Sequence, residues 1–172
     1  MSKYLLNEQF KNNLKRLDIE FKRKRSYVLI NQKNINMGNL KNKISYEEAL
    51  KFMKDLYEQI EEMEYDNYYY RFLNLEDILW IDGRYLIINY NNIQKTENDI
   101  IQIENDNSLN YNVVSPELRC SSFPIQMNVN KIYYNIALLT LELMENTFEE
   151  IQNTKLYYLL YKCMYYSKFI YI

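Results

Sequence analysis

The chain has no histidine and only two glycines, two cysteines and two prolines among its 172 residues. Without histidine, it cannot build a Ser-His or Cys-His nucleophile pair or a His-ligated metal centre. Gly38 and Gly83 lie too far apart for a dinucleotide-binding or Walker loop, because each of those loops needs clustered glycines. Cys120 and Cys163 lack CxxC spacing, so the sequence favours two reduced thiols, with one disulfide as the alternative.

A surplus of one charge and long apolar runs are also missing. The chain has 21 Lys and Arg against 23 Asp and Glu, so we expect no nucleic-acid partner, because phosphate binding needs a basic surplus. No segment approaches the roughly 18 apolar residues of a membrane-spanning helix, and the N-terminus does not resemble a signal peptide. The sequence therefore predicts a cytoplasmic protein without membrane contact.

Hydrophobic residues make up 48% of the chain, which is enough for one folded domain. Tyrosine is unusually frequent at 19 residues, and asparagine, isoleucine and lysine are also abundant. This composition is typical of an AT-rich genome, so the tyrosines are not by themselves evidence of a binding surface.

Apolar spacing predicts a helix over residues 3–20. The basic run at 22–25 is either an anion-binding patch or, as we favour, a solvated turn. The β-branched and aromatic run at 27–30 predicts a strand, and the polar segment at 31–43 predicts a loop.

The strongest local signals lie in the middle of the chain. Ser45 and Glu48 form a capping-box pattern ahead of an apolar stripe, which predicts a helix over residues 46–63. Two apolar runs flank Asp82-Gly83, which predicts a hairpin over residues 78–88.

The second half of the chain begins with a long polar segment at 89–112, for which we expect a loop. Ser115 and Pro116 predict a helix start, and two further helices are expected at 132–145 and 154–166. Several tyrosines of the last helix either pack in the core or form an aromatic binding face: Tyr157, Tyr158, Tyr161, Tyr165 and Tyr166.

From residue 27 onward, the order of elements resembles the protein kinase fold from its fifth strand to its late helices. Residues 70–79 are similar to the catalytic loop, and Asn89-Tyr90-Asn91 stands where kinases have Asp-Phe-Gly. Ser115-Pro116-Glu117 stands where kinases have Ala-Pro-Glu.

The resemblance implies a mostly α fold with a small β-hairpin (α+β), like the C-terminal lobe of a kinase. We expect a single truncated domain over residues 1–172. Residues 1–26 would form an N-terminal helix and a basic turn, and residues 27–172 a hinge followed by the lobe-like region.

The residues that perform kinase chemistry are replaced at the matching positions. Phe72 stands at the catalytic aspartate, Asn74 at the phosphate-contacting lysine, and Asn89 at the magnesium-binding aspartate. Arg71 is either a relic of a phosphate-sensing arginine or a surface residue. Asp77 is the one candidate metal ligand that the resemblance leaves.

Packing positions of the family are better retained. Tyr70 and Tyr90 match two residues that stack inside kinases, and Ser115, Pro116 and Glu117 match a structural motif. Kinases pair that glutamate with an arginine, for which Lys168 is the nearest substitute. The aspartate with which kinases anchor the catalytic loop is replaced here by Ile132.

The resemblance therefore implies a non-catalytic, kinase-like module, or pseudokinase, acting as an interaction or scaffold protein. It is similar to kinase-like proteins of large DNA viruses, so we expect a viral protein in the host cytoplasm or the virion. No cofactor is expected, whereas a protein partner or self-association is.

Two alternatives stay open. One is a residual nucleotide-binding or weak serine/threonine kinase-like protein, which would take ATP and magnesium. Its nucleotide would contact Ile30, Asn31, Gln32 and Leu79. The other is a helical structural or virion protein unrelated to kinases.

Overall fold

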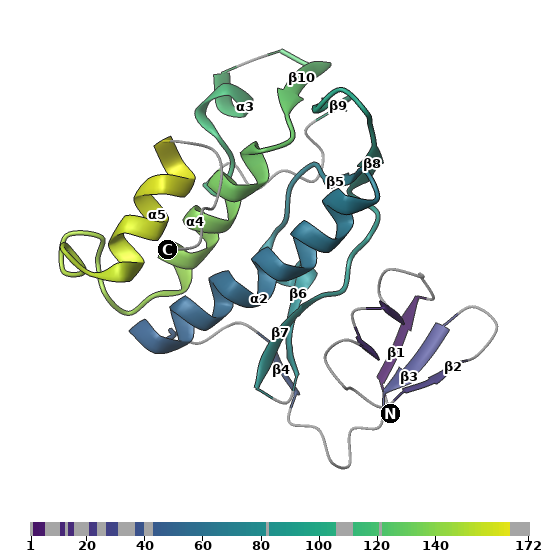
Figure 1. Ribbon diagram of the computed structural model, residues 1–172, viewed down its shortest axis with the longest axis horizontal. Helices are drawn as coiled ribbons and strands as arrows, with labels where there is room; N and C mark the ends of the chain where they lie inside the picture. Colours follow the sequence, from purple (N-terminus) through teal and green to yellow (C-terminus); the bar gives the residue numbers. More distant parts are fainter. Residues whose placement is uncertain are drawn as a thin grey trace.

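The computed structural model describes residues 2–5, 11–12, 14–15, 21–23, 27–30, 37–39, 43–81, 83–105, 112–120 and 122–165 (Figure 1). Its described helical elements are α2 (Tyr46–Tyr65), the 3-10 turn η2 (Leu75–Asp77), α3 (Pro116–Cys120), α4 (Lys131–Leu143) and α5 (Lys155–Tyr165). Its described strands are β1 (Ser2–Leu5), β2 (Phe21–Arg23), β3 (Tyr27–Ile30), β4 (Met37–Asn39), β5 (Tyr68–Tyr70), β6 (Ile78–Ile81), β7 (Arg84–Ile87), β8 (Ile93–Lys95), β9 (Ile100–Ile103) and β10 (Ile125–Asn128).

Helix α2 confirms the prediction from its capping pattern. The Ser45 hydroxyl accepts a hydrogen bond from the Glu48 amide at 3.3 Å, and the Glu48 carboxylate accepts one from the Ser45 amide at 3.4 Å. The apolar stripe faces the main core, where Phe52 and Leu56 are fully buried. Burial of each such side chain contributes about 1.5–3 kcal/mol to the free energy of unfolding.

The expected hairpin is also confirmed, because β6 and β7 pair antiparallel around Gly83, which has a φ of +79°. Two buried side chains of α2 bond to the outer edge of β7. Asp55 accepts from the Tyr85 amide at 2.9 Å, and Gln59 accepts from the Ile87 amide at 3.0 Å. Gln59 also donates to the Tyr85 carbonyl at 2.8 Å. These bonds satisfy backbone groups that would otherwise be unpaired at a sheet edge.

The predicted fold class was wrong. The described strands cover 21% of the chain and form four small antiparallel sheets, so the fold is a mixture of helix and strand. It is not a mostly α lobe with one hairpin. The predicted likeness of the fold to the C-terminal lobe of a kinase was therefore also wrong. The sheets are β1-β3-β2, β4-β6-β7, β5-β8 and β9-β10.

The missed strands lie in segments that were expected to be loops. Strand β4 lies within 31–43, and β8 and β9 lie within 89–112. Each of these strands has only three or four residues. Such short runs have little intrinsic preference, and pairing with a partner far along the chain determines their conformation.

The prediction of a helix over residues 3–20 was wrong at its start. Residues 2–5 form strand β1, which pairs with β3, instead of the start of a helix. Helical turns remain at residues 11–12 and 14–15, and the rest of the 3–20 segment lies outside the described residues. Lys22 and Arg23 of the basic run belong to β2. The strand at 27–30 is confirmed.

Helices α4 and α5 match the two expected helices to within two residues at each end. They pack with α2 around the main core, and α5 lies against α4 (Figure 1). A second, smaller core lies beneath β9 and β10.

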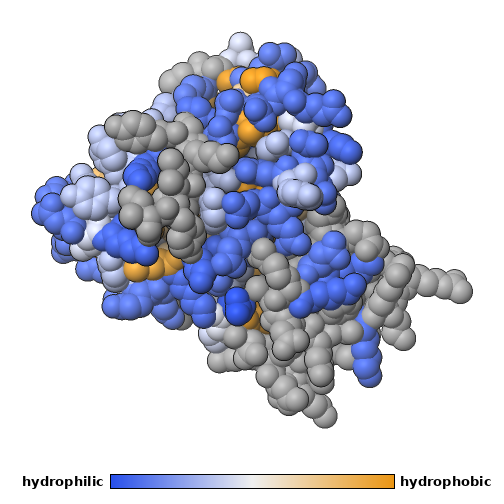
Figure 2. Space-filling model, in the orientation of Figure 1, coloured by the Kyte–Doolittle hydropathy of each residue, from blue (hydrophilic) through white to orange (hydrophobic). Residues whose placement is uncertain are grey.

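Among the residues coloured in Figure 2, hydrophilic ones cover most of the visible face. In the part of the chain that the structure describes, no helix is both long enough and apolar enough to cross a lipid bilayer.

Candidate functional site

The segment from Tyr70 to Asp77, which resembles a catalytic loop, is anchored from α4 by a buried asparagine. Asn135 accepts a hydrogen bond from the Leu73 amide at 2.8 Å and donates to the Leu73 carbonyl at 3.1 Å. It also donates to the Val113 carbonyl at 2.7 Å. One side chain therefore joins three segments that are distant in the sequence.

Sequence reasoning placed the anchoring position at Ile132, which is instead buried among apolar side chains. The anchor is Asn135, about one helical turn later on α4. A signal for it was present in the sequence, because Asn135 interrupts the most apolar segment of the chain. A buried polar side chain in such a segment needs hydrogen-bond partners, and the loop provides them.

Asp77 ends the same loop with both carboxylate oxygens hydrogen-bonded inside the protein. One oxygen accepts from the Asn89 side-chain amide at 2.6 Å, and the other accepts from the Asn74 backbone amide at 2.8 Å. The Asp77 side chain is only 4% exposed. Its backbone carbonyl accepts from the Ile88 amide at 2.8 Å, which ties the loop to the end of the hairpin.

This geometry brings together two of the predicted site residues, Asn89 and Asp77. They are joined by a hydrogen bond between a neutral amide and a carboxylate. Asn89 is a neutral donor to Asp77, where a metal site would place a second anionic oxygen. Among the described residues, no three aspartate, glutamate or cysteine side chains gather to hold a metal ion. Asp77 therefore acts in this structure as a hydrogen-bond acceptor that organises the loop.

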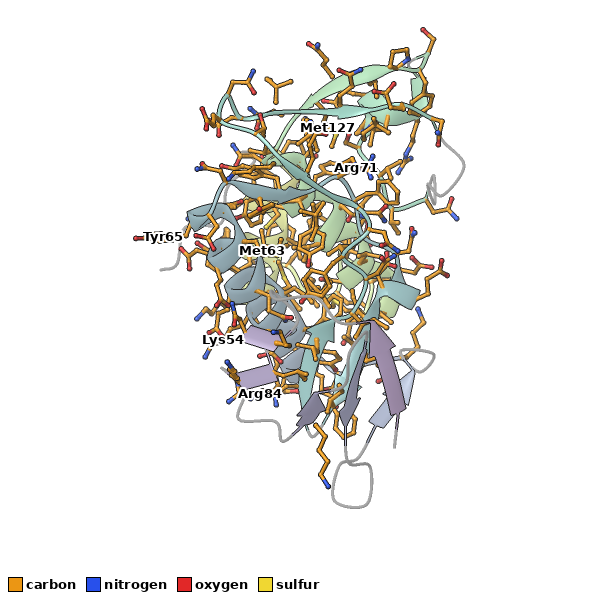
Figure 3. The ribbon with its side chains drawn as sticks, turned by 90° about the vertical axis from the view of Figure 1, so that its right-hand side faces the viewer. Lys54, Met63, Tyr65, Arg71, Arg84 and Met127 are labelled. Atoms are coloured by element: carbon orange, nitrogen blue, oxygen red, sulfur yellow. The ribbon has the colours of Figure 1, made fainter. Side chains whose placement is uncertain are left out.

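The remaining loop residues also have structural partners. Phe72 is 4% exposed and packs into the second core with Ile101 and Met127. Arg71 donates from its backbone to the Asn92 carbonyl at 2.7 Å and from its guanidinium to the Asn91 carbonyl at 3.1 Å. Figure 3 shows Arg71 beneath β9 and β10, on the side of the molecule where Met127 lies.

In the resemblance drawn from the sequence, Phe72 stands where kinases have the proton acceptor of phosphoryl transfer, and a phenyl ring cannot accept a proton. Asn74 is buried as well, with 8% of its surface exposed. The loop therefore has an ordered backbone without the acid–base group that the resembled family uses.

Tyr70 and Tyr90 lie in ring contact, with centroids 6.0 Å apart and planes tilted by 48°. Tyr70 is 1% exposed, and this burial raises the pKa of its hydroxyl well above the ordinary value. The hydroxyl therefore stays protonated at physiological pH and provides no base.

Helix α3 begins at Pro116, directly after Ser115, as expected from the sequence. Glu117 pairs with Lys131, whose Nζ lies 2.6 Å from the carboxylate, and Lys168 lies outside the described residues. This hydrogen bond is the main reason that the pKa of Glu117 is lowered. Both side chains are partly exposed, so the pair contributes at most about 1 kcal/mol to stability.

The residues proposed for nucleotide contact do not form one described site. Ile30 ends β3 in the β1-β3-β2 sheet, whereas Leu79 lies in β6 of the β4-β6-β7 sheet. Asn31 and Gln32 lie outside the described residues.

Cys163 provides no candidate nucleophile. Cys163 is buried in the main core, and burial raises the pKa of its thiol to about 12. Such a thiol stays protonated and unreactive at neutral pH. Cys120 is the last residue of α3.

Comparisons with protein-family models and with curated proteins find no match for this chain.

Proposed function

We propose that this protein is a non-catalytic interaction or scaffold module whose sequence keeps motifs that resemble those of kinases. The observation that supports this most directly is the 2.6 Å hydrogen bond from Asn89 to Asp77. In the resembled family, these two positions hold magnesium against the nucleotide phosphates. Here they bond to each other.

The surroundings of this pair support the same proposal. Phe72 is a core residue at the position of the catalytic base, and Asp77 uses both carboxylate oxygens within the chain. A cation would have to displace these bonds and would find a neutral amide as its second ligand. Loss of chemistry with retention of an ordered loop is expected of a domain maintained for its surface.

The fixed conformation of the loop also supports an interaction role. Asn135 holds Leu73 through two buried hydrogen bonds, although no catalytic group depends on that placement. The segment thereby presents a constant backbone conformation. Most of the loop is buried, so its fixed backbone acts by holding the exposed elements around it in place, and a preorganised surface loses less conformational entropy when it binds a partner.

For partners and location, we propose a protein partner or a second copy of the chain, and no nucleic acid. The near-balanced charge of −2 supports the exclusion of nucleic acid. The composition supports an AT-rich viral source, with the protein in the host cytoplasm or the virion.

A thermal-shift titration with ATP, with and without magnesium, tests the absence of chemistry. We expect no rise in melting temperature up to millimolar ATP, because binding to the folded state would stabilise it by mass action. Inorganic triphosphate at equal ionic strength is the control for nonspecific anion effects. A magnesium-dependent rise with ATP alone, or autophosphorylation abolished by Asp77→Ala, would establish the residual kinase alternative instead.

A further inference from the structure

Helix α5 has a hollow on its outer surface, of about 280 Å³. The residues that line it are Lys155, Tyr158, Leu159 and Lys162. The two lysines lie two helical turns apart and bracket the two apolar side chains. Neither lysine forms an ion pair with a described residue. The hollow is therefore an apolar depression with a positively charged rim.

The same face exposes aromatic surface. Tyr158 is 53% exposed and Tyr165 is 67% exposed, whereas Leu156 and Leu160 on the opposite face are fully buried. The α5 side chains buried in the main core are Leu156, Leu160 and Cys163, whereas Tyr157 is only partly buried against that core, and Tyr166 lies outside the described residues. Two large aromatic side chains are therefore exposed on one face of α5.

The complementary feature lies at the C-terminal end of α2. Tyr65 is 90% exposed, the highest value among the exposed large hydrophobic residues of the described chain. Its exposed neighbours Glu61, Glu62 and Asp66 are all acidic. Figure 3 shows Tyr65 projecting away from the molecule, while Met63 points into it. Tyr65 is thus a protruding aromatic ring within a negatively charged surface.

The protrusion and the hollow match in size and in charge. A cavity of about 150 Å³ already accommodates a benzene ring, so the α5 hollow has room for the ring of Tyr65. The lysine rim would then face Glu61, Glu62 and Asp66. Opposite charges around a buried aromatic anchor are the usual arrangement of a specific protein interface.

The two features do not meet within one copy of the chain. The start of α5 contacts the start of α2, where the Leu156 amide donates to the Tyr46 hydroxyl. Tyr65 lies at the other end of the same helix, about 28 Å away at 1.5 Å per residue. Figure 1 likewise shows α5 on the opposite side of the molecule from the end of α2.

We propose that a second copy of this chain inserts Tyr65 into the α5 hollow. The proposal rests on the proposed function as an interaction module, and it assigns self-association to these two surfaces. The two surfaces differ, so the contact is heterologous and either closes into a symmetric assembly or continues from copy to copy. Two α5 faces would not pair with each other, because their lysines repel.

Sedimentation velocity of the full chain tests this proposal at increasing protein concentration. We expect concentration-dependent association that weakens from about 50 mM to about 500 mM salt, because salt screens the charge pairs. Two variants remove one surface each: Tyr65→Ser with Glu61→Gln and Glu62→Gln, and Lys155→Glu with Lys162→Glu. Each should weaken self-association by about tenfold or more.

Mixing the two variants is the decisive step. The first keeps an intact hollow and the second keeps an intact Tyr65, so the mixture should form dimers and nothing larger. Glu76→Gln with Glu104→Gln, at two exposed positions outside the residues that form either surface, is the matched charge control and should associate like the unmodified chain. Circular dichroism melts establish that every variant is folded.

Three outcomes would overturn the proposal. They are a monomer at all concentrations up to about 1 mM, association unchanged in both variants, and a mixture that stays monomeric. None of these outcomes bears on ATP binding, so the proposed non-catalytic role would still be judged by the thermal-shift titration.

Discussion

Asn135 and Leu73 are 62 positions apart in the chain, yet the asparagine side chain bonds both the amide and the carbonyl of Leu73. The Asn135 side chain makes the two hydrogen bonds to Leu73 that a neighbouring β-strand would make in a sheet. Because both groups are buried, no water is available to take over these bonds. This single contact connects the buried helix α4 to the loop that resembles a catalytic loop.

Replacing Asn135 with alanine should therefore be strongly destabilising. The change leaves the Leu73 amide and two carbonyls buried without this partner, so we expect a loss of about 3 kcal/mol in the free energy of unfolding. Urea denaturation followed by circular dichroism measures it. Asn130→Ala is a matched control, because the Asn130 side chain makes no capping bond at the start of α4. A loss no larger than that of the control would show that the anchor is dispensable.

Asn89→Asp tests the interpretation of the Asp77 pair. The substitution puts a second carboxylate where the amide now donates at 2.6 Å, so a favourable bond becomes a repulsion. We expect a lower melting temperature at neutral pH, recovered in part by millimolar magnesium, because a cation then has two anionic ligands. The original chain should not respond to magnesium.

Asn89→Ala separates the lost bond from the added charge. It removes the donor without adding a carboxylate, so it should lower the melting temperature without any magnesium response. Equal magnesium responses in the original chain and in the aspartate variant would contradict the prediction. They would show that Asp77 binds the cation unaided.

Asp55 should make stability depend on pH. Burial, the largest cause, raises the pKa of Asp55 above its ordinary value of 3.8 in the folded protein. The folded state then binds the proton more tightly than the unfolded state. The resulting stability is present in full below the unfolded pKa and is lost as pH rises through the folded pKa.

Asp55→Asn removes this titration and keeps an oxygen that accepts from the Tyr85 amide. The stability of the variant relative to the original chain should therefore rise between about pH 3 and pH 7. Urea denaturation at several pH values measures the difference. A difference that stays constant with pH would mean that Asp55 titrates alike in the folded and unfolded states.

Gly83→Ala should be destabilising through the backbone alone. Gly83 has a φ of +79°, where a side chain costs about 1–2 kcal/mol. Among the described residues, an added Cβ would meet the flexible end of Lys51 at 3.5 Å, which is an ordinary contact. Thermal melts of Gly83→Ala and of the neighbouring exposed control Arg84→Ala distinguish the turn effect from a general surface effect. Equal melts would contradict the prediction.

Local signals in the sequence predicted the elements whose causes lie within a few residues. The capping box of Ser45 and Glu48 located α2, and the Asp-Gly turn located the hairpin. The strands that were missed have no such signal. Strand β4 includes Gly38 and exists because it pairs with β6, about 40 residues later in the chain.

The sequence by itself determined that this chain has no histidine chemistry and no glycine-rich phosphate loop, and it located the principal helices and the hairpin. Those conclusions need only the identities of the residues and their spacing over a few positions in the chain. Only the tertiary structure decided the mixed fold, the anchoring by Asn135 and the bond between Asn89 and Asp77. Each of these depends on contacts between residues distant in the chain, which the hydrophobic core brings together and local spacing does not encode.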